Sequence, residues 1–261
     1  MTTQGALPLF PGAPSPPGFS RTVLGRRHAL LDPASHVRGG LPGFPAAAAV
    51  VLISPQMGAQ FAQYRIDLEA GAVGRSEETA LESFFYLLDG EAVAESGGLS
   101  LSLAPGGFFF SPPGMRWTLG AGRAGARGVL FQKVYAALPG TPIPPSVAGR
   151  AQEVESIPFL GDPEALLQAF LPEDPSFDMA VNLFSFRPGA ALPFVETHEM
   201  EHGLLMFEGR GIYRLEDSWY PVCAGDAIWM APYCPQWFAA LGPTPARYLY
   251  YKNMARHPLA G

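Results

Sequence analysis

The sequence has few charged residues and no long hydrophobic run, and both absences narrow the kind of protein it can encode. Charged residues make up 15% of the 261 positions, against roughly 25% in typical soluble proteins. Lysines and arginines form no block, and the net charge is −6, so neither nucleic acid nor an anionic membrane is an expected partner. The longest apolar run, residues 44–53, is about half the roughly 20 residues that a membrane-spanning helix needs. It predicts a buried strand.

Cysteine is also scarce. Cys223 and Cys234 are the two cysteines of the chain, so there is no disulfide framework, and the N-terminus lacks the pattern of a signal peptide. We therefore expect a reducing, cytoplasmic setting. Both thiols are expected to be small buried side chains, with a place in a pocket as the alternative for Cys234. Because 48% of the residues are hydrophobic, burial between subunits of a homo-oligomer is expected as well.

Glycine and proline are abundant, with 30 and 28 residues, and they leave little room for long helices. The apolar segments are short and end in turn residues, which is typical of an all-β protein. Residues 1–45 are rich in proline near their start and predict an extended N-terminal arm. Residues 162–170 are the one clear helix candidate, with Asp162 as N-cap and Pro163 at the first helical position.

The two halves of the chain repeat each other. Residues 83–95 align with 202–214, which places Gly90 on Gly209, and a proline-rich turn that follows in each half aligns in the same way. Each half reads as short strands separated by glycine turns. The repeat predicts two small β-barrels, residues 46–150 and residues 151–261.

The stretch "ETHEMEH", residues 196–202, admits two interpretations. A zinc-protease motif needs His198 and His202 on one helix, but Pro193 and Gly203 flank the stretch and oppose a helix. On a straight strand the two histidines would lie roughly 13 Å apart at about 3.3 Å per residue, too far to share a metal ion. The chain is therefore predicted to bend between them and to place His202 beside His198 at the start of the next strand. The intervening glutamates, Glu199 and Glu201, are expected on a solvated turn.

The spacing of five residues in this region matches the first motif of the cupin superfamily: Gly189, Glu196, His198, His202 and Gly209. Compared with the usual motif, glutamate and histidine have exchanged places, and Gln236 stands where the second motif has a histidine. This combination, continued in residues 211–222, 224–232 and 248–253, resembles the (S)-ureidoglycine aminohydrolase family of purine degradation. The resemblance covers both halves and implies a bicupin fold of two tandem cupin barrels.

The resemblance also implies a metal centre in the C-terminal barrel. Its ligands would be Glu196, His198, His202 and Gln236. Two imidazoles, one carboxylate and one amide oxygen leave coordination positions open and suit Mn²⁺ or Fe²⁺ better than a structural zinc. The ligand set leaves these two ions open, and the family implies Mn²⁺.

For the reaction, the resemblance implies hydrolysis of (S)-2-ureidoglycine to (S)-ureidoglycolate and ammonia. Tyr213, Tyr248 and Lys252 would contact this small-molecule substrate, and Glu196 and Lys252 would act as the catalytic groups. Two alternatives remain open: another metal-dependent cupin enzyme, a dioxygenase or isomerase of a small organic acid, and a cupin that binds a ligand without turnover.

The N-terminal half lacks this ligand set. The repeat places Glu77, Thr79, Ser83 and Arg116 at the four positions. Neither histidine is kept, and an arginine beside the remaining carboxylate would repel a divalent cation. We therefore expect the N-terminal barrel to be free of metal and to serve packing, assembly or support of the pocket.

Overall fold

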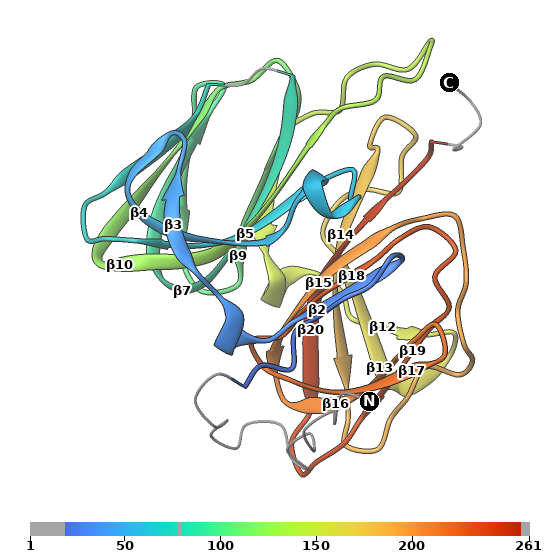
Figure 1. Ribbon diagram of the computed structural model, residues 1–261. Helices are drawn as coiled ribbons and strands as arrows, with labels where there is room; N and C mark the ends of the chain where they lie inside the picture. Colours follow the sequence, from blue (N-terminus) through green and yellow to red (C-terminus); the bar gives the residue numbers. More distant parts are fainter. Residues whose placement is uncertain (1–18, 78–79, 257–261) are drawn as a thin grey trace. The chain divides into compact units, whose positions relative to one another are not determined.

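The computed structural model describes residues 19–77 and 80–256, and their regular structure is almost entirely β (Figure 1). Within these ranges there is no α-helix, and the helical turns are three short 3-10 segments: η1 (Pro33–Ser35), η2 (Pro55–Met57) and η3 (Ala151–Glu153). No helix in the described part of the chain is long and apolar enough to cross a membrane. The predicted all-β fold is confirmed.

The described chain forms two compact units. The C-terminal barrel unit comprises residues 19–36, 158–167 and 183–250, and the N-terminal barrel unit comprises residues 37–157, 168–182 and 251–256 apart from the gap at 78–79. Each unit is therefore built from segments that are not consecutive in the sequence. The predicted division at residues 45 and 150 is simpler than this arrangement.

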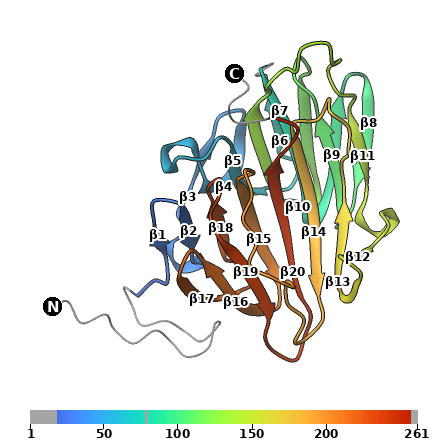
Figure 2. The same ribbon diagram turned by 90° about the vertical axis from the view of Figure 1, so that its right-hand side faces the viewer.

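The C-terminal barrel unit contains most residues of two sheets. The larger has the order β1-β2-β18-β15-β20-β14-β13-β12, and the smaller has the order β17-β16-β19; Figure 2 shows β18, β15, β20 and β14 following one another across the larger sheet. The strands of the larger sheet are β1 (Val23–Leu24), β2 (His28–Leu31), β12 (Ile157–Phe159), β13 (Asp162–Ala169), β14 (Met179–Phe186), β15 (His202–Glu208), β18 (Ala227–Met230) and β20 (Ala246–Asn253). Those of the smaller sheet are β16 (Arg210–Leu215), β17 (Ser218–Cys223) and β19 (Gln236–Ala240).

Apolar side chains of both sheets meet in one core. Leu204 and Met206 on β15 pack in the same cluster as Tyr213 on β16 and Phe238 on β19, and each is at most 1% exposed. The alternation of inward and outward residues along these strands explains why one sheet face is apolar. Facing apolar sheets bury this surface, as in a cupin barrel.

The N-terminal barrel unit contains one continuous sheet in the order β11-β9-β7-β10-β5-β4-β3, with β6 paired to β10 and β8 paired to β7. Its strands are β3 (Arg38–Leu41), β4 (Phe44–Ile53), β5 (Ala62–Leu68), β6 (Val73–Ser76), β7 (Leu81–Ser96), β8 (Leu99–Leu103), β9 (Gly107–Ser111), β10 (Trp117–Val134) and β11 (Val147–Arg150). The long antiparallel pair β7 and β10 lies side by side in Figure 1. The apolar run 44–53 forms the strand β4, as predicted, but this strand is only partly buried, because Pro45, Ala46 and Val51 are exposed.

The aligned glycines of the repeat have the same role in both barrels. Gly90 and Gly209 have φ values of +83° and +73°, a conformation that glycine adopts at little cost. A Cβ atom would lie 2.2 Å from the carbonyl oxygen of Gly125 at the first position and 2.2 Å from that of Pro245 at the second. The two barrels therefore share a backbone contact that admits no side chain, which supports the alignment.

The helix predicted for residues 162–170 is wrong, because this segment forms β13. Leu160 and Gly161 precede it with φ values of +52° and +85°, and two positive φ values are typical of the short turns that join antiparallel strands. Asp162 accepts a hydrogen bond from the amide of Glu164 at 2.9 Å, which is the contact expected of an N-cap but here belongs to the turn. Pairing with β12 and β14 overrides the local helix preference.

Part of the predicted N-terminal arm forms strands of the C-terminal barrel unit. Its first eighteen residues lie outside the described residues, but β2 pairs with β18 of the C-terminal barrel unit, from Ala227 opposite Leu31 to Met230 opposite His28. An unpaired edge on β18 would leave backbone groups open for association. The N-terminal strands cover that edge.

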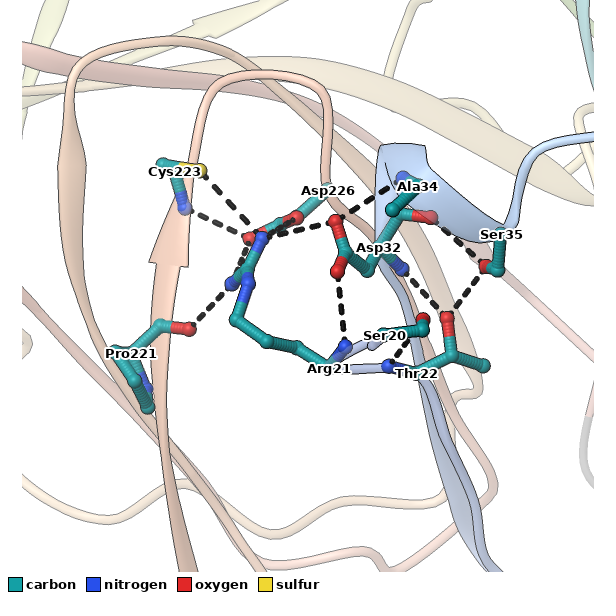
Figure 3. Close-up of polar contacts among 9 residues, drawn as sticks. All are labelled: Ser20, Arg21, Thr22, Asp32, Ala34, Ser35, Pro221, Cys223 and Asp226. Carbon is teal, nitrogen blue, oxygen red and sulfur yellow. Dashed lines mark hydrogen bonds and ion pairs between the residues drawn. The ribbon is translucent and has the colours of Figure 1, made fainter. Parts of the chain in front are cut away.

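A buried ion cluster fastens this segment to the barrel (Figure 3). The Arg21 guanidinium donates to both carboxylate oxygens of Asp226, at 2.6 and 2.9 Å, and lies 3.3 Å from Asp32. Arg21 is 7% exposed and Asp226 is fully buried. Burial raises the pKa of Asp226 even with the guanidinium beside it. The cluster holds two acids and one base in a region shielded from water, so the arginine is needed to compensate the negative charge of the carboxylates.

We predict that Arg21→Met lowers the free energy of unfolding by about 3–5 kcal/mol, because it leaves two buried carboxylates without their counter-charge. Arg187→Met is the matched control, since Arg187 and Glu164 form an exposed ion pair at 3.0 Å and its loss should change stability by less than about 1 kcal/mol. Denaturant unfolding at neutral pH measures both. Equal effects of the two substitutions would contradict this account of the cluster.

Candidate metal and substrate site

The site is organised by a backbone pair between the two cupin motifs. The amide of Glu196 donates to the carbonyl of Gln236 at 2.8 Å, and the amide of Gln236 donates back at 2.9 Å. Residues that exchange both hydrogen bonds lie directly opposite each other and point their side chains to the same face. Gln236 begins β19 and is 2% exposed. The pair therefore brings a carboxylate and a buried amide together from distant parts of the chain.

The predicted bend between the two histidines is confirmed. His198 lies in a loop and His202 begins β15, with their ring centroids 4.6 Å apart. His202 is 8% exposed and His198 is half-buried. No helix forms in this region, so the zinc-protease interpretation is excluded.

Both imidazoles face the side chain of Gln236. The amide nitrogen lies 3.1 Å from Nε2 of His198 and 3.3 Å from Nδ1 of His202. Nδ1 of His198 lies 3.1 Å from the carbonyl oxygen of Met200, and because a carbonyl only accepts, this nitrogen carries the proton. Nε2 of His198 therefore presents its lone pair to the amide. Two imidazole nitrogens converge on one donor group, which is the arrangement that a cation would need.

The two tyrosines of the predicted pocket lie in the same interior. The hydroxyl of Tyr213 donates to Oε1 of Gln236 at 3.3 Å, and the rings of Tyr213 and Tyr248 are 6.4 Å apart. Burial, followed by the negative charge of Glu196, raises the pKa of Tyr213 well above its ordinary value. Burial, the neighbouring tyrosines and Glu196 do the same for Tyr248. Both hydroxyls are neutral at physiological pH and can donate hydrogen bonds.

Glu196 joins this group through its backbone pair with Gln236, and Lys252 is placed by strand β20. Within residues 19–77 and 80–256, no group of three or more His, Cys, Asp or Glu side chains that could hold a metal ion is found. Lys252 is half-buried near the end of β20. By strand alternation it shares the face of Tyr248 and Tyr250. Its contact with substrate stays a prediction.

Two nearby residues were missed or misjudged from the sequence. Tyr250 lies 5.3 Å from His202 between ring centroids, and the alternation along β20 could have indicated it. Glu201, expected on a solvated turn, is 1% exposed and accepts a hydrogen bond from the Trp229 indole at 3.3 Å. No local signal in the sequence links Glu201 to Trp229, because the contact depends on the folded barrel.

The equivalent positions of the N-terminal barrel differ in chemistry. Nε of Arg116 lies 3.5 Å from the carboxylate of Glu77, and both side chains are exposed. Ser83 is fully buried and accepts a hydrogen bond from Gln132 at 3.0 Å. Thr79 lies outside the described residues. The arginine does stand beside the one carboxylate of this set, as the repeat predicted.

Comparison with solved structures defines the class of protein. The chain aligns with the E. coli protein Ylba at a TM-score of 0.82 and 31% identity, covering 91% of this chain and 96% of that one. It also aligns with oxalate decarboxylase of Bacillus subtilis at a TM-score of 0.68, but at 13% identity that likeness shows the fold alone. The two barrels and the paired motifs define a bicupin.

Comparison of sequences identifies the family. No family model matches the chain. A probable (S)-ureidoglycine aminohydrolase of rice is 37% identical over 246 residues, which cover 93% of this chain and 78% of the rice protein. The (S)-ureidoglycine aminohydrolase of E. coli is 34% identical over 87% of this chain and 88% of that protein. The chain belongs to the (S)-ureidoglycine aminohydrolase family of enzymes.

Cys234 belongs to the core of this barrel, as the first expectation for the cysteines had it. It is 3% exposed, and burial raises the pKa of its thiol to about 11. Burial and the charge of Asp226 also raise the pKa of the half-buried Cys223 thiol.

We predict that neither thiol reacts rapidly with a disulfide reagent in the native protein at pH 8, because the thiolate is the reactive form and is scarce below the raised pKa. A Cys223→Ser variant isolates Cys234 for the measurement, and both thiols should react at once when the protein is unfolded. Fast modification of Cys234 in the folded variant would show that it faces an accessible pocket.

Proposed function

We propose that this enzyme catalyses the manganese-dependent hydrolytic deamination of (S)-2-ureidoglycine to (S)-ureidoglycolate and ammonia. The convergence of His198 and His202 on the Gln236 amide is the observation that carries the proposal. Family membership supports the same reaction, because the relatives are named for it.

The residues fit a divalent cation with open positions. Two imidazoles supply neutral nitrogen donors, and the amide of Gln236 supplies an oxygen donor once rotated by half a turn, which exchanges its two nearly isosteric ends. The Tyr213 hydroxyl both donates and accepts, so it can bond the amide in either orientation. Glu196, directly opposite Gln236, would complete the set. Oxygen and nitrogen donors without thiolate suit Mn²⁺.

A bound cation would supply Lewis-acid polarisation of the substrate or of water. The substrate carries its carboxylate, amine and ureido group on one carbon. Departure of ammonia breaks the carbon–amine bond while the ureido nitrogen donates its electron pair to form an imine. Water then adds to the imine carbon and loses a proton, so one water is consumed and one ammonia is released.

The side chains of the barrel would orient the substrate and move the protons. A carboxylate oxygen of Glu196 can take the ureido N–H proton as the imine forms and pass it to the leaving amine, and can then take a proton from the adding water and return it to the imine nitrogen. Lys252 can clamp the substrate carboxylate or manage the proton on the amine. The neutral hydroxyls of Tyr213 and Tyr248 can hold the ureido arm and leave one face of the carbon open. The product would then be a single enantiomer.

The purified enzyme should release ammonia from freshly prepared (S)-ureidoglycine and carry about one Mn²⁺ per chain, and His202→Ala should lose most of that metal because one of few strong ligands is gone. Elemental analysis and an ammonia assay measure the two properties. Stoichiometric zinc, an unchanged metal content in the variant, or metal bound in the N-terminal barrel would contradict the assignment. Absence of ammonia release above the spontaneous rate would exclude the substrate.

Lys252→Met should keep the fold and the bound Mn²⁺ but lower the rate of ammonia release by roughly 10²-fold or more, as expected when a positioned proton-transfer group is lost. The enantiomeric composition of the product reports the pocket independently of the rate. Near-normal turnover by the variant, or a racemic product from the parent enzyme beyond the spontaneous background, would refute this role of Lys252 and its tyrosine neighbours.

A further inference from the structure

The loop that carries Glu196 and His198 has little regular pairing of its own. Between the end of β14 and the start of β15, its strand-like contacts are two isolated bridges, Ala191 with Ala239 and Glu196 with Gln236. Beyond Glu196, the backbone of His198 is held from outside the loop by a different residue. The contact that this residue makes lies directly at a candidate ligand.

That residue is Tyr233, in the turn between β18 and β19. Its amide donates to the carbonyl oxygen of His198 at 2.7 Å, and its own carbonyl accepts a hydrogen bond from the Thr197 hydroxyl at 3.3 Å. The two bonds connect the turn to consecutive residues of the loop. Together with the contact between His198 Nδ1 and the Met200 carbonyl, they fix both the backbone and the ring of His198.

The backbone of Tyr233 is in an unusual conformation. Its φ is +60°, in the left-handed region that glycine and asparagine enter far more readily than an aromatic residue. The residue is 53% exposed, so packing in the core does not account for this conformation. Pro232 precedes the residue and Pro235 lies two positions after it. The backbone amide of Cys234 closes the turn by donating to the carbonyl of Ala231 at 3.1 Å. A strained residue that contacts a candidate ligand points to a role at the site.

We propose that Tyr233 is a positioning residue for His198, and that it acts through its backbone. The left-handed conformation directs the Tyr233 amide at the His198 carbonyl and so holds the imidazole toward Gln236. The proposal rests on the proposed function in one respect, because it takes His198 as a metal ligand. The aromatic ring has no part in it.

Two substitutions separate the backbone from the ring. Tyr233→Pro removes the amide donor and forces a negative φ, whereas Tyr233→Gly removes the ring but keeps the donor and adopts a positive φ freely. We expect Tyr233→Pro to weaken Mn²⁺ binding by roughly tenfold or more, as for other losses of a group that orients a metal ligand. Tyr233→Gly should keep the affinity for Mn²⁺ within about threefold of that of the parent protein. Competition with a chelator, using Mn²⁺ alone, measures both affinities.

Tyr233→Val serves if the proline variant does not fold. Valine keeps the amide donor but is strongly disfavoured at φ near +60°, so its affinity should fall between those of the other two variants. Comparable losses in the glycine and proline variants would assign the effect to the ring and overturn the proposal. So would unchanged affinity in the proline variant.

Hydrogen exchange of the metal-free protein gives a readout that needs no metal. The Tyr233 amide should be protected in the parent protein, residue 233 should stay protected in Tyr233→Gly, and residues 198–200 should exchange faster in Tyr233→Pro. An unprotected Tyr233 amide in the parent protein would overturn the proposal. If the parent protein bound no Mn²⁺ while this exchange pattern held, the metal assignment would fail and the positioning of His198 would stand.

Discussion

The pair of backbone hydrogen bonds between Glu196 and Gln236 is the constraint on which the rest of the site depends. The loop after β14 also pairs with β19 around Ala191 and Leu192, and the Glu196–Gln236 pair extends this pairing to the residues of the site. The pair fixes which side chains stand opposite each other, and the amide of Gln236 then meets both imidazoles. The chemistry of the site follows from register: a slip by one residue would turn Gln236 away from the barrel interior.

Much of this geometry could be predicted from the sequence, because some residues obey local rules that tertiary structure does not change. Gly90 and Gly209 occupy backbone positions that exclude any side chain, and this requirement made the repeat visible. The bend between His198 and His202 followed from the length of a straight strand set against the reach of one metal ion. In both cases a steric or geometric limit left a single solution.

Other features depend on partners far along the chain, and no local pattern in the sequence indicates them. Residues 162–170 carry a good local helix signal, yet a hairpin turn and two neighbouring strands make them β13. Arg21 forms a hydrogen bond with Asp226, and the His28 ring forms hydrogen bonds with Glu216 and Tyr220 at 2.9 Å each. Each of these side chains is unremarkable where it stands in the sequence. Once buried, each side chain needs a hydrogen-bond partner, and that partner comes close only in the folded barrel.

The two barrels show how a fold and a site can be separated. Their shared turns rest on glycines whose positive φ values and close contacts leave no freedom, so these positions are the same in both halves. The positions of the predicted ligands carry no such demand. Ser83 stands at the position of a histidine and accepts a hydrogen bond from Gln132, while Arg116 forms a surface ion pair with Glu77. These two replacements each have a protein partner, so neither position needs a cation to match it. In the C-terminal barrel the same positions hold groups that face one another and can be matched by a cation, which is why chemistry is expected there and not in its repeat.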